Sequence, residues 1–378
     1  MSLTVTSCTD PDDWDREVNA AGGHPMQLWG WGQTKAKHNW SVDRVLVLDG
    51  AGTIGSAQIL VRKLPFPFRS LAYIPRGPQA VPGRRLEVAQ RLAEYARETR
   101  GSVALSIEPD WEVSAGDGAD AADVGGTGPA GDGAGTADDD WQHTAVAAGW
   151  QQSSNTILIA RTLILDLNQS AEDLQAQMSK TTRQNIRKSF KKDVQFRRVT
   201  TGEELAAIME IYRETAERAG FGLHSDDYYR DIFDHLGAAS PVLAAFDAEG
   251  PVAFVWLARS QRTAFELYGG VNERGQKLRI NYGVKWYAIE TMKDDGVERY
   301  DFNGLLNDGI SDFKKQFARH ENMLVGTWDK PLSPLYPLFA RALPLARKAT
   351  QKVLPAARGV LDRARPAAQA VRPSAWTR

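Results

Sequence analysis

Two stretches of the chain, residues 44–108 and 242–304, carry the same order of sequence patterns. Each begins with an apolar run that enters a turn, RVLVLD before DGAGT and PVLAAFD before AEG, and two more apolar runs follow. Next comes a stretch with helical apolar spacing, over 85–100 or 281–295, and then a last apolar run, VALSIEP or RYDFNG. This repeat predicts two copies of one α/β module, and the order of elements is typical of an acyltransferase-like module.

Composition limits the class of protein. The 378 residues are 25% charged and 42% hydrophobic, which is typical of a globular chain with a real core. Cys8 is the lone cysteine, no apolar run is as long as a membrane span, and the N-terminus lacks a basic-then-apolar signal pattern. We therefore expect a cytoplasmic protein. The six histidines show no HExxH spacing and no cysteine companion, so we predict neither a metal ion nor a cofactor.

Acidic charge is concentrated in one segment, from Glu112 to Asp140. This segment is almost entirely Gly, Ala and Asp, with eight acids and no Lys or Arg. Such a composition cannot bury enough apolar area to offset the entropy of ordering. We predict a disordered loop inserted within the first module.

Basic charge is concentrated at the C-terminal end, in residues 331–378. This tail has nine Lys or Arg, the single acid Asp362 and seven prolines. One interpretation is a solvated, partly disordered end. The alternative is a segment resting on anionic lipid or RNA phosphate, with Leu338, Phe339, Leu343 and Leu345 beside Arg341, Arg347, Lys348 and Lys352.

A second basic cluster, KTTRQNIRKSFKK, lies between the modules. On a helix, its apolar side would hold Met178, Ile186 and Phe190. Like charges four residues apart repel in an isolated helix, so a polyanion is a plausible partner, although a solvated helix face has the same pattern. No sequence-specific nucleic-acid motif accompanies the cluster, which favours contact with an RNA backbone. The candidate tRNA-binding residues are Lys180, Arg183, Arg187, Lys188, Lys191 and Lys192.

Several common catalytic motifs are missing from the sequence. It has no GxSxG elbow, no Walker A loop and no GxGxxG after a strand, which speaks against triad hydrolysis and nucleotide hydrolysis. The second module also lacks the Q/RxxGxG/A loop that cradles the pyrophosphate of acetyl-CoA, and NERGQKLRINYG stands in its place. If the module is catalytic, another acyl donor is implied.

An ordered series of motifs covers most of residues 24–330: MQLWGWGQTKAKHNW, AQILVRKLP, SLAYIPRGP, KTTRQNIRKS, YRETAERAGFGLHSDDYY, LYGG, NYGVKWYAIE, RYDFNG and GISDFKKQF. The series closely resembles the Fem family of peptidoglycan interpeptide-bridge aminoacyltransferases, in its branch without a coiled-coil arm. The resemblance implies an α+β fold of two tandem GCN5-related N-acyltransferase-like modules, with mixed sheets flanked by helices. It also implies that aminoacyl-tRNA donates an amino acid to the stem-peptide side-chain amine of a peptidoglycan precursor, either lipid II or UDP-MurNAc-pentapeptide.

The resemblance assigns the reacting centre to a lysine near the end of the second module. An aminoacyl ester is already activated, so the protein must mainly position the amine and stabilise the oxyanion, and lysine suits that task. The matching residue is Lys314, preceded by Phe313. Lys315 is a competing candidate, Ser311 stands where the family more usually has an aromatic residue, and an ordinary surface lysine is the alternative interpretation.

The resemblance also assigns residues to the acceptor and its diphosphate. Lys35 and Arg218 match the family's diphosphate contacts, with Lys37 an alternative to Lys35, although each alone could be a solvated charge. Tyr268 is expected to line the acceptor cleft, or else to be a core tyrosine. Further candidates of the same kind are Tyr73, Arg76 and Trp31.

The sequence therefore predicts a first module over 1–165, interrupted by the insert 112–140, and a second module over 166–318. A strand in 319–330 is expected to return to the first module, and the basic tail 331–378 is expected to contact anionic membrane at the inner face of the plasma membrane. Two alternatives to the aminoacyltransferase remain open. One is a coenzyme-A-dependent N-acyltransferase, and the other is a non-catalytic RNA- or membrane-binding protein.

Overall fold

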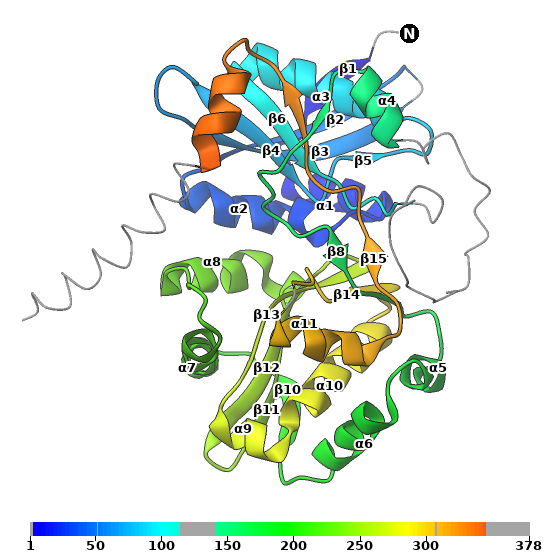
Figure 1. The fold of residues 1–378 in the computed structure, drawn as a ribbon, viewed down its shortest axis with the longest axis vertical. Helices are drawn as coiled ribbons and strands as arrows, with labels where there is room; N and C mark the ends of the chain where they lie inside the picture. The colour runs from blue at the N-terminus through cyan, green and yellow to red at the C-terminus, as the bar shows by residue number, and fades with distance from the viewer. Residues whose placement is uncertain (1–2, 51, 114–140, 307, 345–378) are drawn as a thin grey trace, which may run out of the picture.

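The computed structural model describes residues 3–50, 52–113, 141–306 and 308–344. These residues form two large sheets, one above the other in Figure 1, and a two-stranded sheet. Most of the predicted acidic insert and the sequence after Pro344 lie outside the described residues. Among the helices of the described part, none is long and apolar enough to span a membrane.

The upper sheet in Figure 1 has the strand order β1-β2-β3-β4-β6-β16-β7, with β5 paired to β3. Helices α1 and α2 lie between the two large sheets, and α3 packs on the upper sheet. The element bounds are β1 Thr4–Ser7, α1 Pro11–Ala20, α2 Trp29–Lys37, β2 Ser41–Leu48, β3 Thr53–Lys63, β4 Ser70–Pro75, β5 Gln79–Ala80, α3 Arg85–Arg100, β6 Ser102–Glu108, α4 Trp141–Ala147, β7 Gln151–Gln152 and β16 Trp328–Pro331.

The lower sheet has the strand order β10-β11-β12-β13-β14-β9. Because β9 already belongs to this sheet, the boundary predicted after residue 165 falls within a strand. The element bounds are β9 Ile164–Asp166, α5 Ala171–Ala176, α6 Lys180–Ser189, β10 Gln195–Arg198, α7 Gly202–Ala219, α8 Asp226–Leu236, β11 Val242–Asp247, β12 Gly250–Arg259, β13 Thr263–Val271, α9 Glu273–Leu278, α10 Ile280–Asp294, β14 Arg299–Asp301 and α11 Gly309–Lys314.

The sequence repeat corresponds to a repeat of topology. In each half, three antiparallel strands, β2–β3–β4 or β11–β12–β13, precede a helix and a strand that pairs in parallel with the third. A parallel pair needs a crossover connection, and α3 and α10 provide it, each burying its apolar stripe. The predicted α+β class, with mixed sheets flanked by helices, is confirmed.

The chain after the second sheet runs back to the first. β15 Asn322–Met323 pairs with β8 Arg161–Thr162 between the two large sheets. β16 then pairs antiparallel with β6, with Trp328 opposite Ile107. The last strand of the chain's described part therefore completes the sheet that the first strands began.

Folded structure extends past residue 331, where the sequence predicts the start of the tail. β16 still includes Pro331, and residues 336–344 form a helix that packs on the first sheet. Tyr336 and Phe339 are buried there and Leu343 is half-buried. The apolar residues expected to face lipid or RNA are thus divided, because Phe339 and Leu343 belong to a core cluster whereas Leu338 is exposed.

Two glycines of the WGWG motif explain how the modules meet. A Cβ on Gly30 would lie 2.3 Å from the carbonyl oxygen of His235 on α8, and one on Gly32 would lie 2.2 Å from Oε1 of Gln58 on β3. Both distances are far below van der Waals contact, so only glycine fits. Helix α2 of the first module is thereby held between its own sheet and helix α8 of the second.

Candidate active site

The second module contains a cavity of about 340 Å³ at the place where two parallel strands stop pairing. β13 and β14 are paired only as far as Phe265 and Asp301, while β13 continues to Val271. The part of β13 beyond its pairing with β14 forms one wall of the cavity, and α7, α10, residues 302–303 and residues 309–314 form the others. A loss of strand pairing thus creates a pocket lined by both backbone and side chains.

Lys314 lies in the wall of this cavity. Its ammonium donates to the carbonyl oxygens of Asn303, at 2.7 Å, and Gly304, at 3.1 Å. Asn303 has a φ of +58°, a left-handed conformation that turns the chain directly after β14. Because an ammonium has three N–H donors, one is left for a ligand. Burial lowers the pKa of Lys314, and this effect outweighs the nearby Glu266 carboxylate, which raises the pKa.

Lys314 and the next residue in the sequence, Lys315, have different surroundings. Lys315 does not line the cavity and forms an ion pair with Glu321 at 2.8 Å. Phe313 does line it, edge-on to Phe317. Ser311 is buried and donates from its hydroxyl to Asp308, the residue that caps the start of α11. A serine thus fixes the first turn of the helix that presents Lys314.

A buried ion pair that the sequence did not suggest lies in the same wall. Lys285 on α10 donates to both carboxylate oxygens of Glu266 on β13, at 2.5 Å each, and both side chains are only 8% exposed. The Tyr300 hydroxyl also donates to Glu266, at 2.7 Å. The available signal was a single acid in the apolar strand TAFELYGG and a lysine on the apolar face of the following helix.

Two of the predicted acceptor contacts, Arg218 and Tyr268, line this cavity. Arg218, near the end of α7, is 42% exposed and donates to the carbonyl oxygen of Val271 at 3.1 Å. Tyr268 is half-buried, and burial raises the pKa of its phenol well above the ordinary value. The phenol therefore stays protonated at neutral pH and can donate a hydrogen bond.

Lys35 approaches from the first module. Its ammonium donates to the Tyr228 hydroxyl at 2.6 Å and lies 4.6 Å from the centre of the buried Trp31 ring. Tyr228 in turn is close enough to Tyr268 for each phenol to affect the pKa of the other. Burial lowers the pKa of Lys35 to about 8. No carboxylate of the described residues lies within ion-pair distance of it, so it is a cation available to an anionic ligand.

Lys37, the alternative to Lys35, is placed differently. Its ammonium pairs with Asp231 of α8 at 2.7 Å, and the same carboxylate contacts His38 at 3.0 Å. The Lys37 side chain is 57% exposed. Asp231 thus already neutralises Lys37 across the contact between the modules.

Tyr73 and Arg76 lie away from this cavity. The Tyr73 hydroxyl donates to Glu108, whose carboxylate also accepts from the backbone N–H groups of Ile157 and Leu158. Arg76 is buried and donates to the carbonyl oxygen of Ile159 at 3.2 Å. It lines a second cavity, of about 370 Å³.

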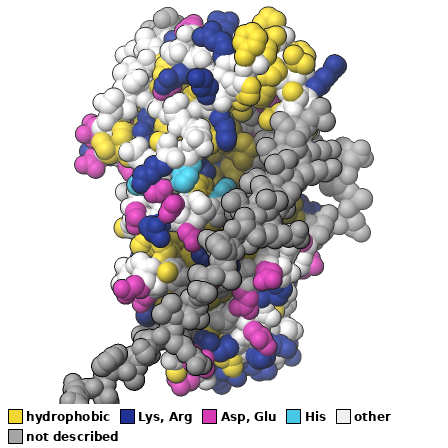
Figure 2. All heavy atoms as spheres, turned by 90° about the vertical axis from the view of Figure 1, so that its left-hand side faces the viewer, with side chains coloured by type: hydrophobic (Ala, Val, Ile, Leu, Met, Phe, Trp, Pro, Cys, Tyr) yellow, Lys and Arg dark blue, Asp and Glu magenta, His cyan; other side chains and the backbone are white. Residues whose placement is uncertain are grey.

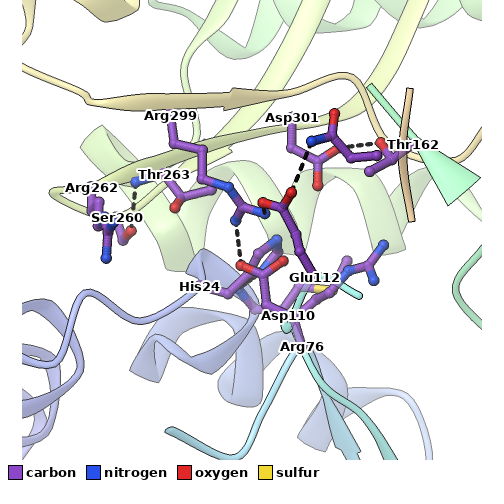
Figure 3. A network of polar contacts seen from close by, with 12 residues as sticks. His24, Arg76, Asp110, Glu112, Thr162, Ser260, Arg262, Thr263, Arg299 and Asp301 are labelled. Atoms are coloured by element: carbon purple, nitrogen blue, oxygen red, sulfur yellow. Dashed lines mark hydrogen bonds and ion pairs between the residues drawn. The ribbon is translucent and has the colours of Figure 1, made fainter. Parts of the chain in front are cut away.

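The second cavity lies where polar residues of both modules meet, as Figure 3 shows. Arg299 of β14 donates to Asp110 at 2.5 Å, and the amide of Asn322 donates to Glu112 at 2.8 Å. Burial alone would raise the pKa of Asp110, but Arg299 holds it below the usual range. Burial lowers the pKa of His24 to about 3, so this imidazole is neutral at pH 7. The network joins the modules through ion pairs and hydrogen bonds between side chains.

The basic cluster between the modules forms α6 and the turn after it. Arg183 donates to the carbonyl oxygens of Gln175 and Met178, and so closes the end of the preceding helix instead of facing solvent. Phe190, expected on the apolar side, is 44% exposed and packs against Phe196. The remaining cations are exposed and lie beyond ion-pair distance of any described carboxylate: Lys180, Arg187, Lys188, Lys191 and Lys192.

No group of three or more His, Cys, Asp or Glu residues within the described ranges could hold a metal ion.

Solved structures share the fold. FemX has a TM-score of 0.74 at 18% identity and covers 90% of this chain and 100% of that one. A tandem GNAT protein from the clavulanic acid biosynthesis pathway has a TM-score of 0.52 at 12% identity and covers 88% and 99%. The fold therefore defines a protein of two tandem GCN5-related N-acyltransferase-like modules.

The family follows from the sequence. The model of the FemAB family matches residues 10–247 and 237–343, so the chain belongs to the FemAB family, and the resemblance drawn from the motifs is confirmed. The lipid II:glycine glycyltransferase of Staphylococcus aureus strain MSSA476 is 22% identical over 411 aligned residues, which cover 88% of this chain and 94% of that protein. The lipid II:glycine glycyltransferase of Staphylococcus epidermidis strain RP62A is 22% identical over 408, with the same coverage.

Proposed function

We propose that the protein transfers an amino acid from aminoacyl-tRNA to the stem-peptide side-chain amine of a peptidoglycan precursor, lipid II or UDP-MurNAc-pentapeptide. The observation that carries the proposal is Lys314, a half-buried lysine whose ammonium has one unused donor in a cavity of the second module. Membership of the FemAB family and the similarity to lipid II glycyltransferases support a transferase acting in peptidoglycan synthesis.

The chemistry fits this residue. The acceptor amine attacks the ester carbonyl, the new C–N bond forms, and the C–O bond to the terminal ribose breaks. The amine loses a proton and the ribose oxygen gains one. The Lys314 ammonium would donate to the oxygen on which negative charge develops, and its lowered pKa would make it a better proton donor than an ordinary lysine.

The acceptor would be held by residues of both modules. Lys35 on α2 and Arg218 on α7 are cations that a diphosphate could contact, and Tyr268 lies on the cavity wall that Arg218 shares. Arginine suits the diphosphate because its planar guanidinium binds phosphate through two parallel hydrogen bonds. The tRNA would lie along α6, where the exposed cations Lys180, Arg187 and Lys188 have no described carboxylate to compete with phosphate.

One feature of the fold bears on whether coenzyme A or tRNA is the acyl donor. The short helix α9 stands between β13 and α10, where coenzyme-A-dependent relatives of this fold carry their pyrophosphate loop, and this favours tRNA as the donor.

The chain after Pro344 has eight Lys or Arg and one Asp. We propose that this sequence contacts anionic membrane at the cytoplasmic side, where a lipid-linked acceptor would be reached.

The test is reconstitution with the purified full chain, lipid II or UDP-MurNAc-pentapeptide, and a mixture of charged tRNAs carrying labelled amino acids. Label should enter the acceptor, and RNase added beforehand should abolish transfer. Acetyl-CoA in place of tRNA should give no product. Transfer from an acyl-CoA that RNase leaves unchanged would contradict the proposal, and so would tRNA binding without transfer to either acceptor.

A further inference from the structure

The turn between β3 and β4 exposes a phenylalanine completely. The sequence there is KLPFPFR, and the Phe66 side chain is 97% exposed. Phe68, two residues further on, packs against Phe339 of the helix formed by residues 336–344, with ring centres 5.6 Å apart. The turn is therefore anchored to the folded core while Phe66 points away from it. One exposed apolar side chain does not by itself indicate a partner, so the side chains around Phe66 have to be considered with it.

The same helix adds a second apolar side chain and a cation. Leu338 is 56% exposed, although Tyr336 and Phe339 on either side of it are buried. Arg341 follows Leu338 by three residues, so the two share the outer face of the helix. We call Phe66, Leu338, Lys63, Arg69 and Arg341 the apolar-basic surface.

The charge around this surface has one sign. Lys63, Arg69 and Arg341 are exposed, and no carboxylate of the described residues is within ion-pair distance of them. The sequence contains no Asp or Glu between Asp49 and Glu87, and none between Asp329 and Asp362. Figure 2 shows hydrophobic side chains gathered in the upper part of the face it views, with Lys and Arg beside them.

We propose that the apolar-basic surface docks on an anionic lipid bilayer, with Phe66 and Leu338 entering the headgroup boundary and the cations contacting lipid phosphate. Exposed apolar side chains surrounded by Lys and Arg match the interfacial region of such a bilayer in polarity and in charge. RNA would match the cations but would give Leu338 no favourable contact. The proposal adds a folded surface to the basic C-terminal sequence, and it is tested without either substrate.

The experiment is sedimentation of the full chain with vesicles of phosphatidylcholine, alone or mixed with phosphatidylglycerol. The wild type should bind the anionic vesicles and not the neutral ones, and salt should weaken binding. Phe66→Ser should weaken binding about tenfold or more, because its transfer free energy is lost. Lys63→Ala and Arg341→Ala should each cost about fivefold at low salt.

Phe190→Ser is the matched control, because Phe190 is also an exposed phenylalanine beside cations, 44% exposed and in the other module. It should bind anionic vesicles like the wild type. Truncation after Pro344 should weaken binding and leave it dependent on Phe66. The proposal is wrong if Phe66→Ser binds these vesicles as tightly as the wild type. It is equally wrong if the wild type binds none, or if Phe66→Ser weakens only tRNA binding.

Discussion

Removing one partner of the buried ion pair between Lys285 and Glu266 should lower the free energy of unfolding substantially. In Lys285→Met, the Glu266 carboxylate would keep the Tyr300 hydroxyl as its one side-chain partner among the described residues, in a place where both side chains of the pair are 8% exposed. Breaking a buried pair from one side costs about 3–5 kcal/mol, because an uncompensated charge stays behind. We expect the free energy of unfolding to fall by about that amount.

A second substitution separates the charge from the packing. Adding Glu266→Gln to Lys285→Met removes the stranded charge, while the amide oxygen can still accept from Tyr300. Replacing both charges of a buried pair by neutral groups of similar volume is often close to neutral, so we expect the double variant within about 2 kcal/mol of the wild type.

The assay is urea unfolding followed by tryptophan fluorescence, with stability obtained by linear extrapolation. Lys277→Met is the matched control, since Lys277 pairs with Glu273 on the neighbouring helix α9 but both side chains are more than two-thirds exposed. Such a surface pair contributes little, so this control should unfold like the wild type. If Lys285→Met matched Lys277→Met, or if the double variant were no more stable than Lys285→Met, the reasoning would be refuted.

Two further predictions concern the proposed reaction, and a third concerns how the stability of the protein depends on pH. Lys314→Met should lower kcat by about 10² to 10³ with little change in either KM, whereas Lys315→Ala should transfer normally in the same labelled-tRNA assay; a slow Lys315→Ala would contradict the assignment. Arg218→Ala should raise KM for the acceptor alone, with Arg218→Lys intermediate, and a changed KM for tRNA would overturn this role. The pKa of Lys35, about 8 when folded against 10.5 ordinarily, makes the unfolded chain bind more protons between these values. Stability relative to Lys35→Met should therefore rise with pH across that window in urea titrations, and a pH-independent difference would refute it.

Local patterns in the sequence were sufficient for the repeat, whereas Lys314 was named through the resemblance to the Fem family and its catalytic role stays a prediction. Helix α3 occupies the predicted 85–100, because its apolar spacing is regular and Gly101 ends it in a left-handed conformation. The tail boundary at 331 came from charge averaged over 331–378, whereas the described structure continues to residue 344. Within 331–344 there is a single cation, Arg341, and the apolar spacing is helical, which already predicts a packed helix.

The ion pair between Glu266 and Lys285 shows what local patterns do not specify. Each of these residues is a charge inside an apolar run. The local sequence does not indicate that the strand and the helix bring the two side chains together. The contact of α2 with α8 is of the same kind, because Gly30 and His235 are far apart in the chain and become neighbours only when both modules are assembled. Such contacts depend on tertiary packing, which overrides the local preference of each segment.

The contact of α2 with α8 also bears on why the chain needs two modules. The cavity that contains Lys314 is built wholly from the second module, as is Arg218. Lys35 comes from the first, and it reaches the tyrosines beside that cavity only because Gly30 lets α2 lie against α8. If the proposed function is correct, the second module supplies the reacting centre. Lys35, a cation for the acceptor, would then depend on the contact of α2 with α8 for its position. Selection for acceptor binding would then act on the packing between the modules as well as on the residues that touch substrate.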